Sequence, residues 1–556
     1  MPVHTDLPPT AAAAALAHAA VLRGLEEVQA YRLEAAMQHF SQAITHDPQH
    51  VDAWVHLGRG FLRLENWANA AMCMETALAL QPGHAWAQHG LAFARYNSGQ
   101  REEALALIDE VCARTADSAM WQLRAYMHSH ASADPLKALQ VYRDWGTRFA
   151  DPLTVRALPM PVDDRSPTRR LRIGYVSADF RRHSIAFFMA SVLEHHDPAQ
   201  VDVHVYSVGP RDDFTDQLQA HVPHWFDVPE LSEEALCALI RSHRIDVLVD
   251  LSGHTEGNRL LTFARRAAPV QVTWLGYMQP LGMKAMDYRI VDSGIAPAGH
   301  DVFYSERLFR VACMASYTPP PDSPMCLEPP MLRKGHPTLI SLNSSAKITD
   351  SMLRLWSRIL AARTDAELVI MVKERTPEAA QAAMQARVEA ACMPLDRVFV
   401  MHQQPLAQFM ELGHIADVAL DTSPVSGGTT TLHALWMGLP VIAMDAERGV
   451  DAGSARTLQG LGLDEDVARD AETYIAAVLR RLDDPEGLRR FRHDARARMQ
   501  AGPLMDYAAR TRELEQAFRL MWLNLLAGEY RWTDLSAASA NALAGATADA
   551  DAALPA

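Results

Sequence analysis

The chain has 556 residues, 49% of them hydrophobic, and a formal net charge of −15. Its length predicts two to four domains, and its hydrophobic content excludes a mostly disordered protein. The negative balance argues against nucleic acid as the main partner, so an anionic ligand requires a local cluster of donors. The alanine-rich run at residues 11–20 is too short for a membrane span and lacks a signal-peptide pattern. The six cysteines are scattered without a C-x-x-C motif. These features predict a reduced, cytoplasmic protein without a structural metal.

Residues 1–155 contain a repeat with an offset of 34 residues. Small alanines recur at this offset, and large apolar residues follow each first alanine at the same spacing. We expect tetratricopeptide-type helix pairs, because alanines let paired helices approach and the large residues fill the gap to the next pair. The array either binds proteins along its concave face or serves only as structural support. The alanines are Ala36, Ala43, Ala70, Ala77, Ala104 and Ala138, and the large residues are Phe40, Met74, Ile108 and Tyr142.

After a Pro/Asp-rich linker, residues 156–167, strand and helix patterns alternate through two predicted lobes, residues 168–320 and 337–535. Residues 321–336 form a proline-rich linker, and the stretch from about 290 is expected to be less regular. Alternation of this kind predicts two doubly wound parallel sheets, with ligands bound at the carboxyl ends of the strands. This is the layout of a GT-B glycosyltransferase, shared with phosphorylases and epimerases. Residues 536–556 are expected to be disordered.

A small-residue turn follows an apolar strand of the second lobe and leads directly into a helix. It contains Gly427, Gly428, Thr429 and Thr430. The first turn of a helix has backbone N–H groups without intrahelical partners, and the helix dipole favours an anion there. The turn therefore predicts a phosphate site.

Three other candidate residues also come directly after predicted strands. His183 is positioned to act as a neutral base near pH 7. His254 follows Gly253 and faces the same edge of the sheet, unless it only stabilises a turn. Lys347 can reach a diphosphate as a point charge, although a solvated surface lysine is the alternative.

Two acidic pairs have the Asp-x-Asp spacing that metal-dependent glycosyl transfer uses. One ends at Asp466 on a late loop, and the other, Asp549 with Asp551, lies in the C-terminal tail. Neither follows a core strand, so we expect chemistry without a metal, supported by Lys347 and helix dipoles.

Taken together, these motifs resemble the O-linked N-acetylglucosamine transferase family, in which tetratricopeptide repeats are fused to two GT-B lobes. This resemblance implies an inverting transferase that moves N-acetylglucosamine from UDP-GlcNAc to serine or threonine hydroxyls without a metal. The implied partners are the UDP-sugar donor and protein or peptide acceptors bound along the repeat groove, with a homodimer left open. The matching segments are Arg172–Phe180 with His183, Gly253–Thr255, Ala268–Tyr277, Met286–Ser293, Asn343–Lys347, Ala416–Thr422 and Gly427–Gly438.

The resemblance also implies roles for individual residues. His183 lies near the acceptor as a candidate base, with His254 and Tyr277 lining the acceptor cleft, and Lys347 holds the diphosphate. The implied nucleotide-sugar site consists of Asn343, Ser344, Lys347, Gln404 near the uracil, Gly427, Gly428, Thr429, Thr430 and His433.

The sequence departs from the family pattern at four positions. Gly428 stands where a histidine is common, and His433 where an acidic residue is expected to bind ribose. Leu406 replaces a polar residue near the base, and no proline directly follows Tyr277. These departures leave three alternatives: a protein O-fucosyltransferase using GDP-fucose, an asparagine N-glucosyltransferase, and a repeat-based scaffold with weak transferase activity. The proton acceptor also stays open between His183 and the donor phosphate.

Overall fold

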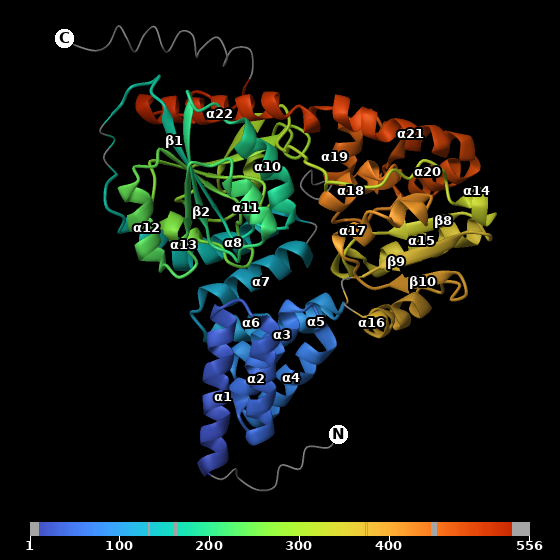
Figure 1. The fold of residues 1–556 in the computed structure, drawn as a ribbon, viewed down its shortest axis with the longest axis horizontal. Coiled ribbons are helices and arrows are strands. Elements are labelled where there is room, and N and C mark those ends of the chain that lie inside the picture. The colour runs from blue at the N-terminus through green and yellow to red at the C-terminus, as the bar shows by residue number, and fades with distance from the viewer. Residues whose placement is uncertain are drawn as a thin grey trace. The chain divides into compact units, whose positions relative to one another are not determined.

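The computed structural model describes residues 11–535, apart from 132–133, 161, 163, 373, 375 and 446–452. Figure 1 shows its helices and strands, coloured along the chain. The chain divides into two compact units. The first unit contains residues 1–131 and 338–409, and the second contains residues 132–337 and 410–556. The predicted tail, residues 536–556, and the pair Asp549 and Asp551 lie outside the described residues.

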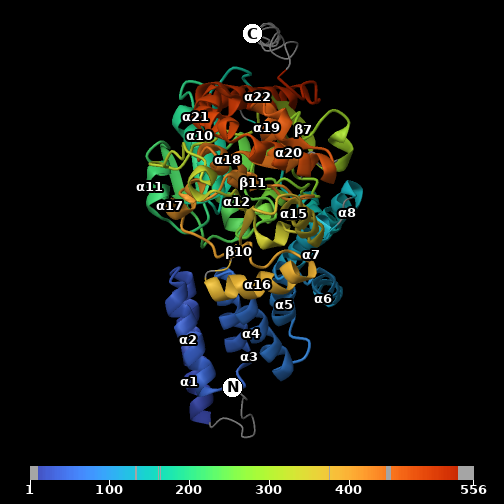
Figure 2. The ribbon, with the colours of Figure 1, turned by 90° about the vertical axis from the view of Figure 1, so that its right-hand side faces the viewer.

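Antiparallel helix pairs make up the N-terminal part of the first unit, as the repeat predicts (Figure 2). The repeated alanines Ala36, Ala43, Ala70, Ala77 and Ala104 are fully buried, so the helices of each pair can approach closely. Phe40, Met74 and Ile108 fill the spaces between the pairs. The helices are α1 (Ala11–Gln29), α2 (Leu33–His46), α3 (Val51–Arg63), α4 (Trp67–Leu80), α5 (Ala85–Asn97), α6 (Arg101–Arg114) and α7 (Ser118–Ala131).

The first unit also holds three parallel strands with the helices that connect them. In spatial order they are β10, β9 and β8, and Leu339 of β8 pairs with Leu368 of β9. The elements are β8 (Thr338–Ser341), the 3₁₀ turn η3 (Ser345–Lys347), α15 (Asp350–Ala362), β9 (Glu367–Met371), α16 (Pro377–Ala390), β10 (Val398–Met401) and α17 (Leu406–Phe409).

A seven-stranded parallel sheet forms the core of the second unit, in the order β3-β2-β1-β4-β5-β6-β7. Tyr175 of the central strand β1 pairs with Val205 on one side and Val249 on the other. Most strand residues are buried on both faces, as helix-covered parallel strands require. The strands are β1 (Leu171–Ser177), β2 (Val201–Ser207), β3 (His224–Asp227), β4 (Val247–Asp250), β5 (Val270–Thr273), β6 (Tyr288–Asp292) and β7 (Arg307–Val311).

Helices and short turns connect these strands, and the last repeat helix belongs to the same unit. This helix, α8 (Pro135–Trp145), continues directly into the π-helical turn η1 (Gly146–Ala150). The backbones approach closely here, because a Cβ atom on Gly146 would lie 1.9 Å from the carbonyl oxygen of Gly282. The helices are α8 (Pro135–Trp145), α9 (Asp151–Val155), α10 (Ser184–His195), α11 (Asp213–Gln219), α12 (Glu233–Ser242), α13 (Leu260–Ala264) and α14 (Met331–Lys334), with the turn η2 (His300–Phe303).

The second unit ends with three further parallel strands, in the order β11, β12 and β13, and a group of helices. The long closing helix α22 lies against α10, where Glu515 accepts a hydrogen bond from the Asp197 amide (Figure 1). The elements are β11 (Val418–Leu420), α18 (Thr429–Trp436), β12 (Val441–Met444), α19 (Gly453–Gly460), β13 (Val467–Ala468), α20 (Ala471–Asp483), α21 (Pro485–Ala501) and α22 (Tyr507–Ala527), with the turns η4 (Leu412–His414), η6 (Asp464–Asp466) and η7 (Pro503–Met505).

The predicted fold class is confirmed: helical repeats are followed by two parallel α/β sheets. One expectation was wrong in part, because strand β7 lies inside the stretch predicted to be irregular. This strand has exposed or half-buried arginines at both ends of an apolar centre, so its hydrophobic signal is short. Within the described residues, no helix has the length and hydropathy of a membrane span.

Candidate active site

Most of the predicted functional residues lie in loops that directly follow the carboxyl ends of parallel strands, and Thr429, Thr430 and His433 lie in the helix α18 after one of them. In the second unit these are the loops after β1, β4, β5 and β11, and in the first unit those after β8 and β10. In open α/β sheets this edge is where ligands bind, because loops there converge without blocking the strands.

The turn between β11 and α18 has the geometry of an anion site. Asp421 Oδ1 accepts a hydrogen bond from the Gly427 amide at 2.8 Å, and the Tyr474 hydroxyl donates to the Asp421 carbonyl at 2.8 Å. Further along, the Thr431 and Ser454 hydroxyls are 2.6 Å apart. These contacts fix the turn from beneath before any ligand arrives, so binding does not have to order it.

Helix α18 begins at this turn with Gly428 as its N-cap, and a glycine has no side chain with which to cap the helix. Gly428 is exposed, and among the described residues no atom lies within 4 Å of a Cβ atom placed there. Thr429 and Thr430 are half-buried on the first turn. A helix N-terminus with a glycine N-cap and adjacent hydroxyls favours a phosphate through its amide groups and its dipole. Gly427 to Thr430 therefore come together as predicted, although phosphate binding itself stays a prediction.

His433 occupies a different environment from the first turn of α18. Its imidazole is buried, its Nδ1 is 2.7 Å from the Tyr317 hydroxyl, and its ring meets Phe187 edge-on at 5.6 Å. Burial lowers the pKa of His433 to about 4, so the ring is neutral at pH 7. A neutral imidazole lacks the negative charge of a carboxylate, so His433 cannot bind ribose in the way an acidic residue would. No local sequence pattern points to Tyr317 as its partner, because Tyr317 lies 116 residues earlier.

In the first unit, the loop after β8 carries Asn343, Ser344 and Lys347. Asn343 is buried, whereas Ser344 and Lys347 are half-buried. The turn η3 is closed by the Lys347 amide, which donates to the Ser344 carbonyl at 2.9 Å. The loop thus carries the three predicted residues within five consecutive positions after β8. Their predicted contacts with a nucleotide diphosphate stay predictions.

Gln404 lies beyond the end of β10 in the same unit. Its side-chain amide donates to the His402 carbonyl at 2.9 Å, and the neighbouring Gln403 amide donates to the Glu374 carbonyl at 2.8 Å. These bonds fold the segment back on itself beyond the strand. A loop fixed in this way can present its backbone to a flat base, which is the role that the resemblance implies.

His183 is the N-cap residue of α10. Its Nδ1 accepts a hydrogen bond from the Ile185 amide at 3.3 Å and lies 3.7 Å from Asp179 Oδ2. The side chain is 39% exposed. When Nδ1 accepts an amide proton, a neutral imidazole carries its own proton on Nε2. In this arrangement Nε2 of His183 is a hydrogen-bond donor, whereas a base needs the other tautomer.

The loop after β4 is closed by packing. Asp250 accepts hydrogen bonds from the Gly253 amide at 3.0 Å and from the Thr273 hydroxyl at 2.9 Å. Gly253 has a φ of +57°, and a Cβ atom there would lie 2.1 Å from Tyr277 Cβ. The glycine is therefore required by the close approach of Tyr277 and by its left-handed backbone.

His254 and Tyr277 come together in a buried aromatic cluster. The His254 Nε2 donates to the Leu281 carbonyl at 2.9 Å, and its ring lies 4.6 Å from that of Trp145 and 4.9 Å from that of Tyr142. The Tyr277 hydroxyl is hydrogen-bonded to that of Tyr142 on α8. Both His254 and Tyr277 are 7% exposed. The structure thus gives them a structural environment beneath α8, and their predicted place in an acceptor cleft stays a prediction.

The acidic residues of the late loop have partners of their own. Asp466 is fully buried and forms ion pairs with Arg481 at 2.6 Å and Arg480 at 3.2 Å. Its carboxylate is therefore committed to closing the loop against α20. The expectation of metal-free chemistry stays a prediction.

Comparison with known proteins assigns the two parts of the chain. The model of glycosyl transferase family 41 matches residues 153–316 and 338–514, and a tetratricopeptide repeat model matches residues 61–125. The solved structure of a mutant Thermobaculum terrenum O-GlcNAc transferase superimposes with a TM-score of 0.87 at 33% identity, covering 93% of this chain and 99% of that one.

Plant proteins show a similar likeness. The probable UDP-N-acetylglucosamine–peptide N-acetylglucosaminyltransferase SPINDLY of Solanum lycopersicum is 32% identical over 406 residues, covering 71% of this chain and 43% of that protein. The corresponding SPINDLY of Arabidopsis thaliana is 33% identical, with coverages of 71% and 44%. The chain therefore spans less than half the length of the curated relatives that it matches.

Proposed function

The chain belongs to glycosyl transferase family 41, and from this premise we propose that it transfers N-acetylglucosamine from UDP-GlcNAc to serine or threonine hydroxyls of proteins. One observation carries the proposal: the start of α18 has a glycine N-cap, Gly428, with Thr429 and Thr430 beside it, and it follows a core strand of a parallel sheet. The names of the plant relatives and of the bacterial neighbour support the choice of donor.

In the proposed reaction the acceptor hydroxyl oxygen attacks the anomeric carbon of the sugar and inverts it. The bond between that carbon and the diphosphate oxygen breaks, and its electron pair leaves with UDP. Thr429, Thr430 and the first amides of α18 stabilise the growing negative charge as hydrogen-bond donors, and Lys347 does so as a cation. These groups supply the stabilisation that a metal ion gives in other transferases, so the proposed mechanism is metal-independent.

The proton of the acceptor hydroxyl goes to a donor phosphate oxygen. The bond from the Ile185 amide to His183 Nδ1 supports this assignment, because it places the ring proton on Nε2. His183 then positions the reactants as a donor. His183→Ala should lower kcat about tenfold, whereas loss of a general base typically costs 10²–10⁴-fold. A loss in that higher range, together with loss of the acidic limb of the kcat/KM pH profile, would make His183 the base.

The experiment that tests the function is calorimetric titration of the purified chain with UDP, UDP-GlcNAc and GDP in the presence of EDTA, followed by sugar transfer to a serine-containing peptide. We expect UDP to bind without metal and Lys347→Ala to weaken it at least tenfold. Lys284→Ala is the matched control, because the Lys284 side chain is 81% exposed and its ammonium lies 3.6 Å from Asp151.

A second donor is favoured by one observation. His433 is buried against Tyr317 and Phe187, so the acidic ribose ligand implied by the family pattern is replaced by a neutral ring. The loss of the acidic ribose ligand weakens the argument that the nucleotide is UDP and not GDP. Tighter binding of GDP than UDP would establish protein O-fucosyl transfer from GDP-fucose instead, and binding of neither would leave a repeat-based scaffold.

A further inference from the structure

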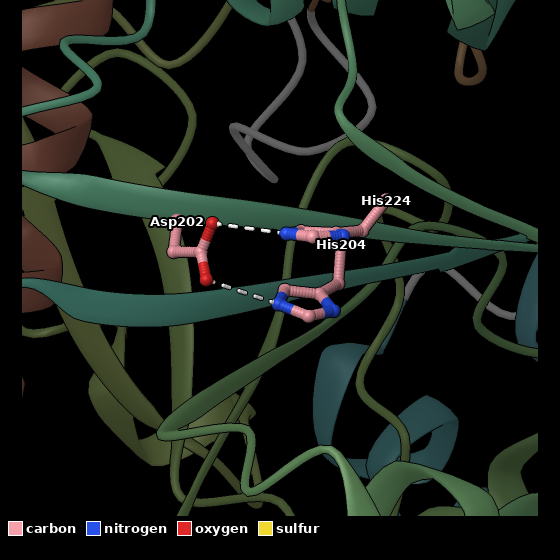
Figure 3. Close-up of side chains that lie close together, drawn as sticks. All are labelled: Asp202, His204 and His224. Atoms are coloured by element: carbon pink, nitrogen blue, oxygen red, sulfur yellow. Dashed lines mark hydrogen bonds and ion pairs between the residues drawn. The ribbon is translucent and has the colours of Figure 1, made fainter.

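Two histidines and one aspartate converge at the edge of the seven-stranded sheet (Figure 3). Asp202 and His204 are two residues apart on β2, so the alternation of a strand places them on one face. In the parallel register of β2 and β3, His204 pairs with His224. The alternation within β2 and the register with β3 therefore bring the three side chains together. Along the chain, Asp202 and His224 are 22 residues apart.

The distances within this cluster are longer than those of ion pairs that only share a proton. His204 Nε2 lies 3.4 Å from one carboxylate oxygen of Asp202, and His224 Nε2 lies 3.4 Å from the other. Charge-assisted hydrogen bonds are typically about 2.7–2.9 Å long. A tetrahedral zinc ion with bonds of about 2.0–2.1 Å separates its ligand atoms by about 3.3–3.4 Å. The spacing therefore fits ligands around one ion.

His204 has the most buried side chain of the three residues. Its ring is 7% exposed, and among the described residues its Nδ1 has no hydrogen-bond partner. Ring contacts with His224 and Phe226 hold the imidazole, and its Nε2 faces Asp202.

One cation competes for the carboxylate. An Arg170 guanidinium nitrogen lies 3.0 Å from Asp202 Oδ1. The Arg170 side chain is 47% exposed, so it can remain on Oδ1 while Oδ2 binds a metal, or move into solvent. The His204 and His224 rings are stacked at 4.4 Å, and the His224 side chain, 43% exposed, is free to turn so that the two lone pairs converge.

We propose that Asp202, His204 and His224 bind a divalent transition-metal ion of the zinc class, which fastens the edge strand β3 to β2. Imidazole nitrogen and carboxylate oxygen are the ligands that zinc uses, and three protein ligands leave a fourth position for water. The site is separate from the strand-end loops assigned to sugar transfer, and its test requires no transferase activity. The sequence scan for metal motifs missed it because a D-x-H strand and a histidine 20 residues later form no recognised spacing.

The test is titration of the full, chelator-stripped chain with Zn²⁺ against a chromophoric competitor. We expect one ion per chain for the wild type, and at least tenfold weaker binding in His224→Ala and in Asp202→Asn. His221→Ala is the matched control, because His221 is an exposed histidine three residues from His224 outside the cluster. Zinc should raise the melting temperature of the wild type and not that of His224→Ala.

Two further readouts separate a metal site from a simple charge cluster. Arg170→Ala should strengthen zinc binding several-fold by removing the competing cation, whereas a cluster that only pairs charges gains nothing from it. Cobalt bound to the wild type should give the intense visible bands of a tetrahedral ion, and these should vanish in His224→Ala. Equal zinc affinity in the wild type and His224→Ala, or the same loss in His221→Ala, would overturn the proposal.

Discussion

Two loops of the second unit start alike and end differently. After β4, Asp250 accepts the Gly253 amide, and after β11, Asp421 accepts the Gly427 amide. The first loop is then covered by the aromatic residues of α8, whereas the second leads to the exposed Gly428 at the start of α18. An aspartate that braces a glycine turn is thus a structural device common to both. Only what packs above the turn decides whether its backbone is available to a ligand.

Adding one methyl group to each loop tests most directly whether the two loops differ in packing. Gly253→Ala should cost about 3 kcal/mol or more, because its Cβ atom would lie 2.1 Å from Tyr277 Cβ and its φ of +57° disfavours any other residue. Gly428→Ala should leave stability nearly unchanged, since none of the described residues lies within 4 Å of a Cβ atom there. Thermal and urea denaturation of both variants measure the difference. Equal stability losses would show that the two loops are equally packed.

Lowering the pH should destabilise the protein through protonation of His254, which is buried in the covered loop after β4. Burial lowers its pKa to about 4, opposed by the bond to Leu281 and by Glu306, while Arg289 lowers it further. A folded-state pKa below the unfolded value of about 6.5 means that the unfolded chain binds more protons between these values. Stability from this group is therefore complete above about pH 6.5 and falls as the pH drops towards 4, by up to about 3 kcal/mol.

The measurement is the melting temperature between pH 7 and pH 4 for the wild type and for His254→Gln, which keeps a side-chain N–H for the Leu281 carbonyl. The variant should lose less stability over this range. His433 also has a pKa of about 4 and remains in both proteins, so it cancels in the comparison. Identical pH profiles would mean that His254 protonates without penalty.

A negative charge in the open loop should abolish ligand binding without unfolding the protein. Gly428→Asp places a carboxylate at the N-cap, a position that favours aspartate and its charge. The same carboxylate repels a diphosphate, and about 3 kcal/mol of repulsion corresponds to roughly 100-fold weaker binding. Calorimetry with UDP and a melting curve test both halves. Gly428→Asn is the neutral control, and unchanged UDP affinity in Gly428→Asp would remove this helix start from the donor site.

The sequence predicted the open loop better than the covered one, for a physical reason. Each element of the β11–α18 turn is local: strand, glycines, threonines and helix follow one another within residues 418–436. His254 was placed correctly at a strand end, but its cover comes from Tyr142 and Trp145, more than 100 residues earlier. No local pattern reports such a contact. His433 was singled out from a family pattern in the same way, and its partner Tyr317 became visible only in the fold.

The same distinction explains which elements were found. Central strands rich in β-branched and aromatic residues, such as β1 and β2, lie inside the lobe that the alternating pattern predicts. The edge strand β3 was missed, because its four residues are His, Trp, Phe and Asp and are half-buried or exposed. Edge strands bury less surface than central ones and are recognised only through the strand that they join. The cluster of Asp202, His204 and His224 was missed for this reason.

The smallest expected effect tests how the covered loop is held to the last repeat helix. Tyr142→Phe removes the hydroxyl that bonds to Tyr277 and keeps the ring that stacks near His254. Loss of one buried hydrogen bond should cost about 1 kcal/mol, with the Tyr277 hydroxyl left to find another partner. The double variant Tyr142→Phe with Tyr277→Phe should be less destabilised than the sum of the two single variants, because each single change leaves one buried hydroxyl without its partner. Additive losses in urea unfolding would show that the two hydroxyls are not coupled. In that case α8 would cover the loop through ring packing alone.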